Sequence, residues 1–245
     1  MKNIIIDIHD DIINNFEIFE IPFILTSPKQ PINFIKYLYE NNCQKQFIKI
    51  SRIQFSLPHI VDYNVLISLL NLSLNNNLQV NFSFNDLAKI IGYKYPSGII
   101  IHRIKYAINA LLETNININD SICFSILSEV NYSLTNSTTK NLNHIIFNKY
   151  FYDSINEYYK KYFNYELYQQ LNNGIAKRIF PFLNRKRNNN TKLTLPIETL
   201  YNLIPHLILE NKYKKESIKR ALYALITVNF IQSFEIHNNI IECVF

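Results

Sequence analysis

The chain has 245 residues, enough for one large domain or two small ones, and 25 basic residues stand against 19 acidic residues. Residues 1–20 contain one basic and five acidic residues, so residues 21–245 carry a net charge of +10, which favours a polyanionic partner. The three glycines fit neither a phosphate-binding loop nor a dinucleotide-binding turn, so those two classes of nucleotide-binding protein are excluded.

The acidic N-terminus and the lack of a long apolar run lead us to expect a cytoplasmic chain. The N-terminus is acidic and lacks the basic region of a signal peptide, and no apolar run reaches the roughly 18 residues of a membrane span. Cys43, Cys123 and Cys243 form no C-x-x-C pair. We therefore expect buried reduced thiols, with no disulfide framework, no metal site and no cofactor.

The first half of the chain predicts a helix-turn-helix followed by a hairpin. Apolar residues recur at three-and-four spacing over residues 62–75, and residues 85–91 form a shorter run that Gly92 ends. Residues 97–114 carry an apolar stripe and predict an amphipathic helix. β-Branched residues then alternate over 116–126 around an Asn-Asp-Ser turn, which predicts a hairpin.

The C-terminal part repeats this pattern at an offset of 114 residues. Identical residues pair Ile104, Lys105, Ala107, Ala110, Leu111 and Asn115 with Ile218, Lys219, Ala221, Ala224, Leu225 and Asn229. Residues 230–245 alternate around a His-Asn-Asn turn. Because a helix-turn-helix followed by a hairpin is a winged helix, we predict a mainly α fold with small β-hairpins (α+β) and two tandem winged-helix domains.

We predict three segments along the chain. Residues 1–20 form an acidic N-terminal segment, residues 21–140 the first winged-helix domain, and residues 141–245 the second. Apolar residues at four-residue spacing predict that a long connecting helix, kinked at Pro181, opens the second domain. These residues are Leu167, Leu171, Ile175, Ile179 and Leu183.

Basic and polar residues on the amphipathic helices and the connector are the candidate DNA contacts, and solvated charge or packing against a neighbouring domain is the alternative for each. In the first module the candidates are Ser97, His102, Arg103, Lys105, Tyr106 and Asn109. In the connector they are Lys177, Arg178, Arg185, Lys186 and Arg187. In the second module they are Lys212, Lys214, Lys215, Ser217, Lys219, Arg220 and Tyr223.

An acidic cluster at the N-terminus gives a competing hypothesis. Asp7, His9, Asp10 and Asp11 follow an apolar run, as metal ligands at the end of a strand do in phosphoesterases. No second cluster of carboxylates and histidines follows downstream to complete such a site. We therefore favour a non-catalytic chain with an acidic tail.

The chain resembles the plasmid replication initiators of the replication initiator protein A type. The resemblance is carried by Leu57-Pro58-His59-Ile60-Val61-Asp62, by residues 103–114 and above all by residues 147–187, which include Ala176-Lys177-Arg178-Ile179-Phe180. It covers the chain from about residue 20 onward. The Ile179-Phe180-Pro181 sequence departs from the uninterrupted helix usual in that family.

The resemblance implies a function in replication initiation. Such initiators bind repeated sites of double-stranded DNA in a plasmid origin, help to open AT-rich duplex, recruit the host initiator and replicative helicase, and repress their own gene as homodimers, without hydrolysing nucleotide. A winged-helix transcriptional regulator would share the DNA-binding features, and a protein-interaction module would not need the basic clusters. A metal-dependent phosphoesterase is the least favoured alternative.

Overall fold

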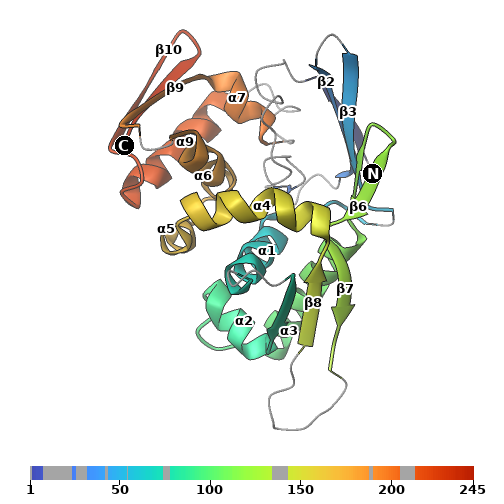
Figure 1. Ribbon diagram of the computed structural model, residues 1–245. Helices are drawn as coiled ribbons and strands as arrows, with labels where there is room; N and C mark the ends of the chain where they lie inside the picture. The colour runs from blue at the N-terminus through green and yellow to red at the C-terminus, as the bar shows by residue number, and fades with distance from the viewer. Residues whose placement is uncertain are drawn as a thin grey trace.

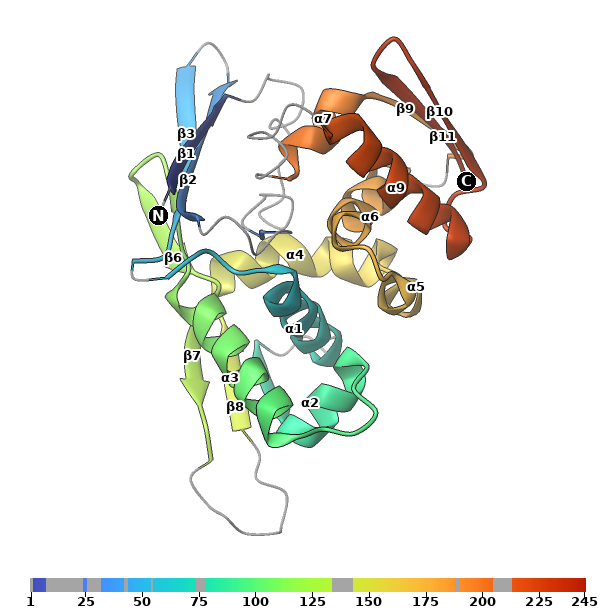
Figure 2. The same cartoon turned by 180° about the vertical axis from the view of Figure 1, so that it is seen from behind.

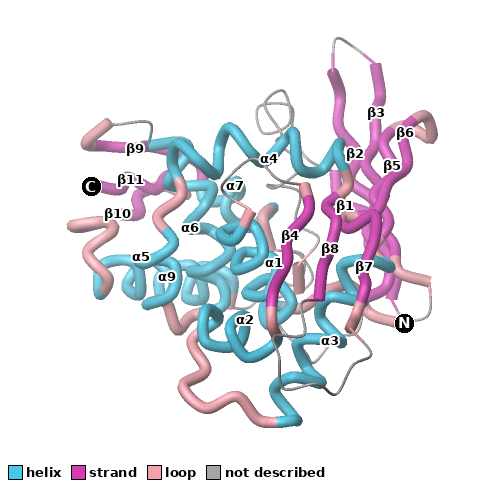
Figure 3. The backbone as a smooth tube through the Cα atoms, turned by 60° about the horizontal axis from the view of Figure 1, so that its bottom comes forward, coloured by secondary structure: helices cyan, strands magenta, loops and turns pink. Residues whose placement is uncertain are grey.

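The computed structural model combines helices with three small sheets (Figure 1). It describes residues 2–7, 24–25, 32–41, 44–53, 55–73, 78–133, 143–187, 190–204 and 213–245. Figure 3 shows helices of both halves gathered between the C-terminal sheet on one side and the N-terminal sheets on the other.

A five-stranded sheet in the order β1-β2-β3-β5-β6 lies at the N-terminal side. Its strands are β1 (Lys2–Asp7), β2 (Ile32–Asn41), β3 (Gln44–Ser51), β5 (Asn115–Ile118) and β6 (Ile122–Ser125). β1 runs parallel to β2, and the other neighbours are antiparallel. The segment expected to be an acidic tail therefore begins with a strand that belongs to this sheet.

The first winged helix contains three helices and a second sheet in the order β4-β8-β7. Its elements in chain order are α1 (Ile60–Leu72), β4 (Gln79–Phe82), α2 (Phe84–Ile91), α3 (Gly98–Glu113), β7 (Leu127–Asn131) and β8 (Asn143–Phe147). The wing is the hairpin β7–β8, and not the hairpin at 116–126 that the sequence indicated. That hairpin exists as β5–β6, but β5 pairs with β3 and joins the five-stranded sheet.

The second winged helix repeats the same order of elements. These are α6 (Gly174–Arg187), β9 (Lys192–Pro196), α7 (Ile197–Asn202), α9 (Lys214–Thr227), β10 (Ser233–His237) and β11 (Ile240–Val244). Its sheet order, β10-β11-β9, places the last strand between the other two, as β8 lies between β4 and β7. The two tandem winged helices predicted from the internal repeat are thus confirmed, with β5–β6 as an insertion in the first.

The connector is not one long helix. It contains α4 (Lys149–Tyr162) and α5 (Tyr165–Gln170) before α6 begins at Gly174. Side chains of Asn164 and Asn173 accept hydrogen bonds from the backbone N–H groups of Leu167 and Ala176, so each asparagine starts a new helix. Asparagine capping therefore interrupts the four-residue apolar pattern, and Pro181 lies inside α6.

Local turns follow the chemistry of their residues. Ser83 caps α2 and Ser97 caps α3 through their hydroxyl groups, and Gly92 ends α2 with a φ of 112°. Positive φ angles occur at Asn119 and Asp120 in the β5–β6 turn and at Asn238 and Asn239 in the β10–β11 turn. Asparagine and aspartate adopt this left-handed conformation more readily than other non-glycine residues, so both hairpins turn where the sequence predicted.

The two winged helices share one hydrophobic core. At their junction, Asn64 of α1 accepts hydrogen bonds from the Tyr168 hydroxyl at 2.8 Å and from the Lys177 ammonium at 3.1 Å. The Ser68 hydroxyl of α1 lies 2.9 Å from the Tyr165 hydroxyl. α1 of the first module is thus joined to α5 and α6, and β8 already lies beyond residue 140, where we predicted the domain boundary. That boundary stays a prediction.

Candidate nucleic-acid interface

The exposed face of α9 carries the best-placed basic residues of the second module. Lys215, Arg220 and Tyr223 are exposed, while Ile218, Ala221, Leu222 and Leu225 on the opposite face are buried. The Lys219 ammonium lies 3.0 Å from a Glu216 carboxylate oxygen, and the Lys214 ammonium lies 5.8 Å from the centre of the Tyr201 ring on α7. Two cations and a phenol therefore remain directed to solvent along one helix.

The second wing contacts this helix but does not add positive charge to it. The Tyr223 ring packs edge-on against Phe234 of β10, with 5.0 Å between ring centres. Along the hairpin, Glu235 lies 3.1 Å from His237, and Glu242 lies 2.9 Å from Lys192 of β9. The positive surface of the second module is thus concentrated on α9, and Ser217 lies half-buried beside it.

The basic segment at the end of α6 forms a separate half-exposed group. Arg185, Lys186 and Arg187 occupy the last turn, where positive charge is favourable next to the helix C-terminus. The Arg187 guanidinium lies 4.7 Å from the centre of the Phe245 ring, and its Nε donates to the Asn190 carbonyl. These residues are available for phosphate contacts only at the edge of the module.

Two connector residues predicted to contact DNA form hydrogen bonds within the protein. Arg178 is only 2% exposed, and its Nε donates to the Leu203 carbonyl at 3.4 Å. Lys177 donates to Asn64, and burial lowers the pKa of its ammonium. Arg178 is thus buried and Lys177 is held by α1, and contact of either residue with DNA stays a prediction. Lys212, also predicted, lies outside the described residues.

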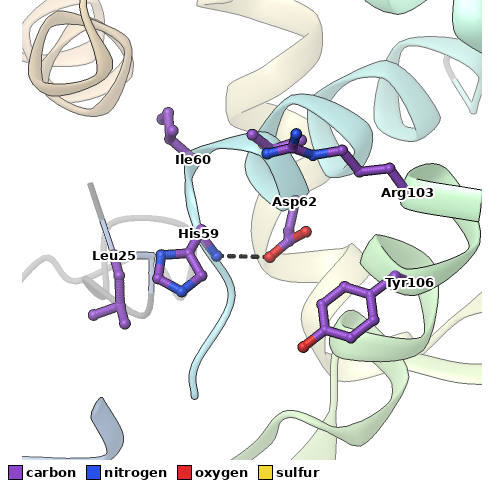
Figure 4. Close-up of a pocket in the computed structure, with 7 residues that line it drawn as sticks. Leu25, His59, Ile60, Asp62, Arg103 and Tyr106 are labelled. Atoms are coloured by element: carbon purple, nitrogen blue, oxygen red, sulfur yellow. Dashed lines mark hydrogen bonds between the residues drawn. The ribbon is translucent and has the colours of Figure 1, made fainter. Parts of the chain in front are cut away.

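In the first module, two of the predicted residues on α3 border a small pocket beside the start of α1. Arg103 and Tyr106 reach toward His59 and Asp62, as Figure 4 shows. The backbone N–H of His59 donates to the Asp62 carboxylate at 2.7 Å. His102, the residue before Arg103 on the helix, is exposed to solvent.

Burial perturbs both titratable groups at the start of α1. It lowers the pKa of the His59 imidazole and raises the pKa of the Asp62 carboxyl. For Asp62, the hydrogen bond from His59 and the charges of His59, Arg52 and Arg103 oppose that increase. Arg103 therefore acts electrostatically on α1 as well as lying on the exposed side of α3.

The other edge of α3 packs against the wing strand. The Tyr132 hydroxyl donates to the Asn109 side-chain oxygen at 2.8 Å, and the Lys105 ammonium lies 5.0 Å from the centre of the Phe84 ring. Asn109 and Lys105 thus help to fix the wing relative to α3. Ser97, at the other end, uses its hydroxyl to cap the helix.

An exposed apolar tip before α3 was not predicted. Tyr95 is 77% exposed and Ile99 is 82% exposed, and the Lys94 ammonium lies 5.3 Å from the Tyr95 ring centre. The signal was present, because Tyr93-Lys94-Tyr95-Pro96 is an unusually aromatic link between two helices.

The third helices of the two modules, α3 and α9, have corresponding places in the order of elements. Figure 2 shows α3 and α9 both on the side of the molecule that faces the viewer. A straight ligand with two major-groove segments on one side could therefore meet both helices.

The comparisons with known proteins agree with this architecture. Residues 63–184 match the family model described as "Initiator Replication protein, WH1". The matched segment is similar to that family of replication initiators and makes up just under half of the chain. The match begins in α1, includes the whole of the first winged helix after it, and ends within α6. The family is one of DNA-binding replication initiators and not of enzymes.

Two solved structures share the fold of nearly the whole chain. The crystal structure of RctB domains 2–3 covers 90% of this chain and 94% of its own, with a TM-score of 0.63 and 12% identity. A crystal structure of domains 2 and 3 of RctB with selenomethionine covers 91% and 95%, with a TM-score of 0.67 and 11% identity. No curated protein sequence matches the chain.

Most residues of the competing phosphoesterase hypothesis lie outside the described part of the chain. Asp7 ends β1, and His9, Asp10 and Asp11 lie outside the described residues. Among the helices that the structure describes, none has the length and apolarity to span a bilayer.

Proposed function

We propose that this initiator binds duplex DNA sequence-specifically at repeated sites in a plasmid origin and starts replication there without hydrolysing nucleotide. The observation that carries the proposal is the exposed face of α9, where Lys215, Arg220 and Tyr223 project from the third helix of a winged helix. In this fold the third helix enters the major groove. Arginine recognises guanine through two parallel hydrogen bonds, which gives the face a means of reading sequence.

The two modules have unequal roles in this proposal. α9 presents two unpaired cations, whereas on α3 Arg103 lies beside Asp62 and Lys105 lies against Phe84. We infer that α9 contributes most of the affinity, and that His102 and Arg103 of α3 make weaker contacts in a second groove segment. Arg185, Lys186 and Arg187 would add phosphate contacts at the edge of the second module, and the bound initiator would recruit host initiator and helicase.

Substitutions on α9 test the proposal. Arg220→Ala should weaken binding to an origin repeat by about 1 to 3 kcal/mol and reduce discrimination at one base pair. Lys215→Ala should weaken binding to all duplex sequences alike and reduce the salt dependence by about one phosphate contact. Fluorescence anisotropy with a repeat and a scrambled duplex measures both effects.

Lys149→Ala is the matched control, because Lys149 is exposed and paired with Asp153 on α4, away from α9. It should leave both affinities unchanged. Plasmid maintenance in cells separates replication initiation from simple repression, since a transcriptional regulator would not be needed for copying the origin. Equal loss of affinity for repeat and scrambled duplex in Arg220→Ala would contradict sequence reading by α9.

A further inference from the structure

A second surface of this chain combines lysine and phenylalanine on the outer face of the five-stranded sheet. Side chains on a strand alternate between faces, and Ile35, Tyr37, Ile48 and Ile50 fill the inner face of β2 and β3, where each is at most 5% exposed. The residues between them, Phe34, Lys36, Phe47 and Lys49, lie on the opposite face and are all partly exposed. We define these four residues as the platform.

The strand register places the platform residues side by side. Lys36 lies directly opposite Lys49, and Phe47 lies opposite Leu38 in the next pair on the same face. The Lys36 ammonium is 4.2 Å from the centre of the Phe47 ring, and the Lys49 ammonium is 5.4 Å from the centre of the Phe34 ring. Two cations and two aromatic rings therefore alternate within one patch.

The outer face of the sheet continues on the strands that flank β2 and β3, and it carries exposed residues there. On β1, Ile5 lies beside Lys36 and is 64% exposed. On β5 and β6, Asn117 and Cys123 continue the row beyond Lys49. Figures 1 and 2 show this sheet at one side of the molecule, away from the C-terminal module.

Lysines that served only to stabilise the sheet would be expected to pair with carboxylates, and the platform contains none. Like charges directly opposite each other destabilise a pair of strands. Within the described part of the chain, neither Lys36 nor Lys49 forms an ion pair, and no carboxylate occurs in the row from Ile5 through Lys36, Lys49 and Asn117 to Cys123. The patch is thus complementary to an anionic ligand.

We propose that the platform binds single-stranded DNA, with phosphates on Lys36 and Lys49 and unpaired bases stacked on Phe34 and Phe47. Aromatic side chains combined with a basic surface are the usual means of binding single strands without sequence preference. The faces of bases in a duplex are already stacked on one another, so the two rings select unpaired bases. The activity differs from duplex recognition by α9 and does not depend on it.

Removal of the rings tests the stacking. The double variant that carries both Phe34→Leu and Phe47→Leu should bind fluorescein-labelled oligo(dT) of about 20 nucleotides at least about fivefold more weakly than the unaltered chain does. Phe34→Tyr with Phe47→Tyr retains both rings and should bind normally. Both pairs of substitutions lie on the outer face, so thermal unfolding should show folded protein. Equal binding by the leucine and tyrosine variants would overturn the proposal.

Removal of the charges tests the phosphate contacts. Each phosphate contact on a single strand contributes about 0.7 to the slope of log affinity against log salt. Lys36→Gln with Lys49→Gln should therefore lower that slope by about 1.4 for oligo(dT), and Lys149→Gln should leave it unchanged. An unchanged slope in the double variant would show that the platform lysines do not contact the strand.

Tryptophan fluorescence locates the strand, because the chain contains no tryptophan. Phe47→Trp should be quenched by oligo(dT) and not by an origin-repeat duplex, whereas Tyr223→Trp on α9 should respond to the duplex and not to oligo(dT). The reverse response would place single strands on α9 and overturn the proposal. The remaining alternative is that the outer face of the sheet binds a second copy of this chain. Two results together would overturn the proposal in favour of self-association. In sedimentation, the unaltered chain would be a dimer that dissociates in Phe47→Leu, and the unaltered chain would not bind oligo(dT).

Discussion

The cysteines show that the burial of a side chain depends on its position in the fold and not on its residue type alone. All three cysteines were predicted to be buried, yet Cys123 is exposed on β6 and Cys243 is buried on β11. Cys43 lies outside the described residues. Alternation along β6 turns Cys123 to the outer face of the sheet, because its neighbour Phe124 occupies the inner face. The sequence did not reveal which face of that hairpin would be covered.

The two described thiols should therefore differ in reactivity. Burial raises the pKa of the Cys243 thiol to about 12, so very little thiolate is present at neutral pH. In a Cys43→Ser background, we expect one thiol to react rapidly with Ellman's reagent in the folded protein and a second to react only after unfolding. Cys123→Ser should remove the fast phase. Persistence of that phase would show that Cys243 is accessible.

His59 should make stability depend on pH. Burial lowers the pKa of its imidazole below the ordinary value of 6.5, so between that value and the folded pKa the unfolded chain binds more protons. The free energy of unfolding should consequently fall as the pH decreases below 6.5. Asp62 acts in the opposite direction above its ordinary value of 3.8, because its pKa is raised in the folded chain.

His59→Gln isolates this contribution of His59. Urea unfolding of the unaltered chain and of His59→Gln at several pH values between 5 and 7.5 should show a steeper loss of stability on acidification when His59 is present. Parallel curves for the two proteins would mean that the imidazole titrates normally in the folded chain.

At the scale of elements, the sequence was most informative where local chemistry decides structure. α2, α3 and α9 occur where the periodicity predicted them, and the asparagine-containing turns form hairpins. The assignment of the wing was wrong because the local pattern shows that β5–β6 is a hairpin but not that β5 pairs with β3. The strands that form the wing, β7 and β8, are separated by residues 132–142, and β8 also pairs with β4. Similarly, the burial of Arg178 depends on contacts with a carbonyl 25 positions away along the chain.

The end of α2 gives a prediction that depends on backbone conformation alone. Gly92 has a φ of 112°, and a β-carbon added there would meet nothing within 4 Å. Gly92→Ala should thus lower the free energy of unfolding by about 1 kcal/mol through backbone strain only. Gly98→Ala is a matched control, because its β-carbon also meets nothing and its φ is ordinary. This substitution should stabilise the chain by about 0.5 kcal/mol.

Thermal and urea unfolding of these two alanine variants measure the difference. Gly98 is the first residue of α3, so its replacement also raises helix propensity. Equal stability of the two variants would show that α2 ends without a left-handed residue in solution.

At the scale of the whole molecule, the junction decides how two modest interfaces act together. The sequence predicted two modules but not their attachment, because the contacts from Asn64 to Tyr168 and Lys177 join residues more than 100 positions apart. The junction contains charged and hydrogen-bonded side chains as well as apolar ones. A junction of this kind fixes the orientation of α3 relative to α9, and in the proposed complex it would set the spacing of the two major-groove segments.

DNA spacing tests whether the modules bind as one rigid unit. If α3 and α9 meet one face of the duplex about 10 bp apart, an insertion of 5 bp between their contacts turns the second segment to the opposite face. Affinity should then fall to that of α9 alone, so that substitution of His102 and Arg103 by alanine has no further effect on the altered site.

An insertion of 10 bp restores the face but doubles the separation, and a packed junction cannot extend to follow it. Both altered sites should therefore bind equally weakly in anisotropy titrations. Recovery of affinity with the 10 bp insertion would require a flexible connection between the modules, which the hydrogen bonds from Asn64 to Tyr168 and Lys177 contradict.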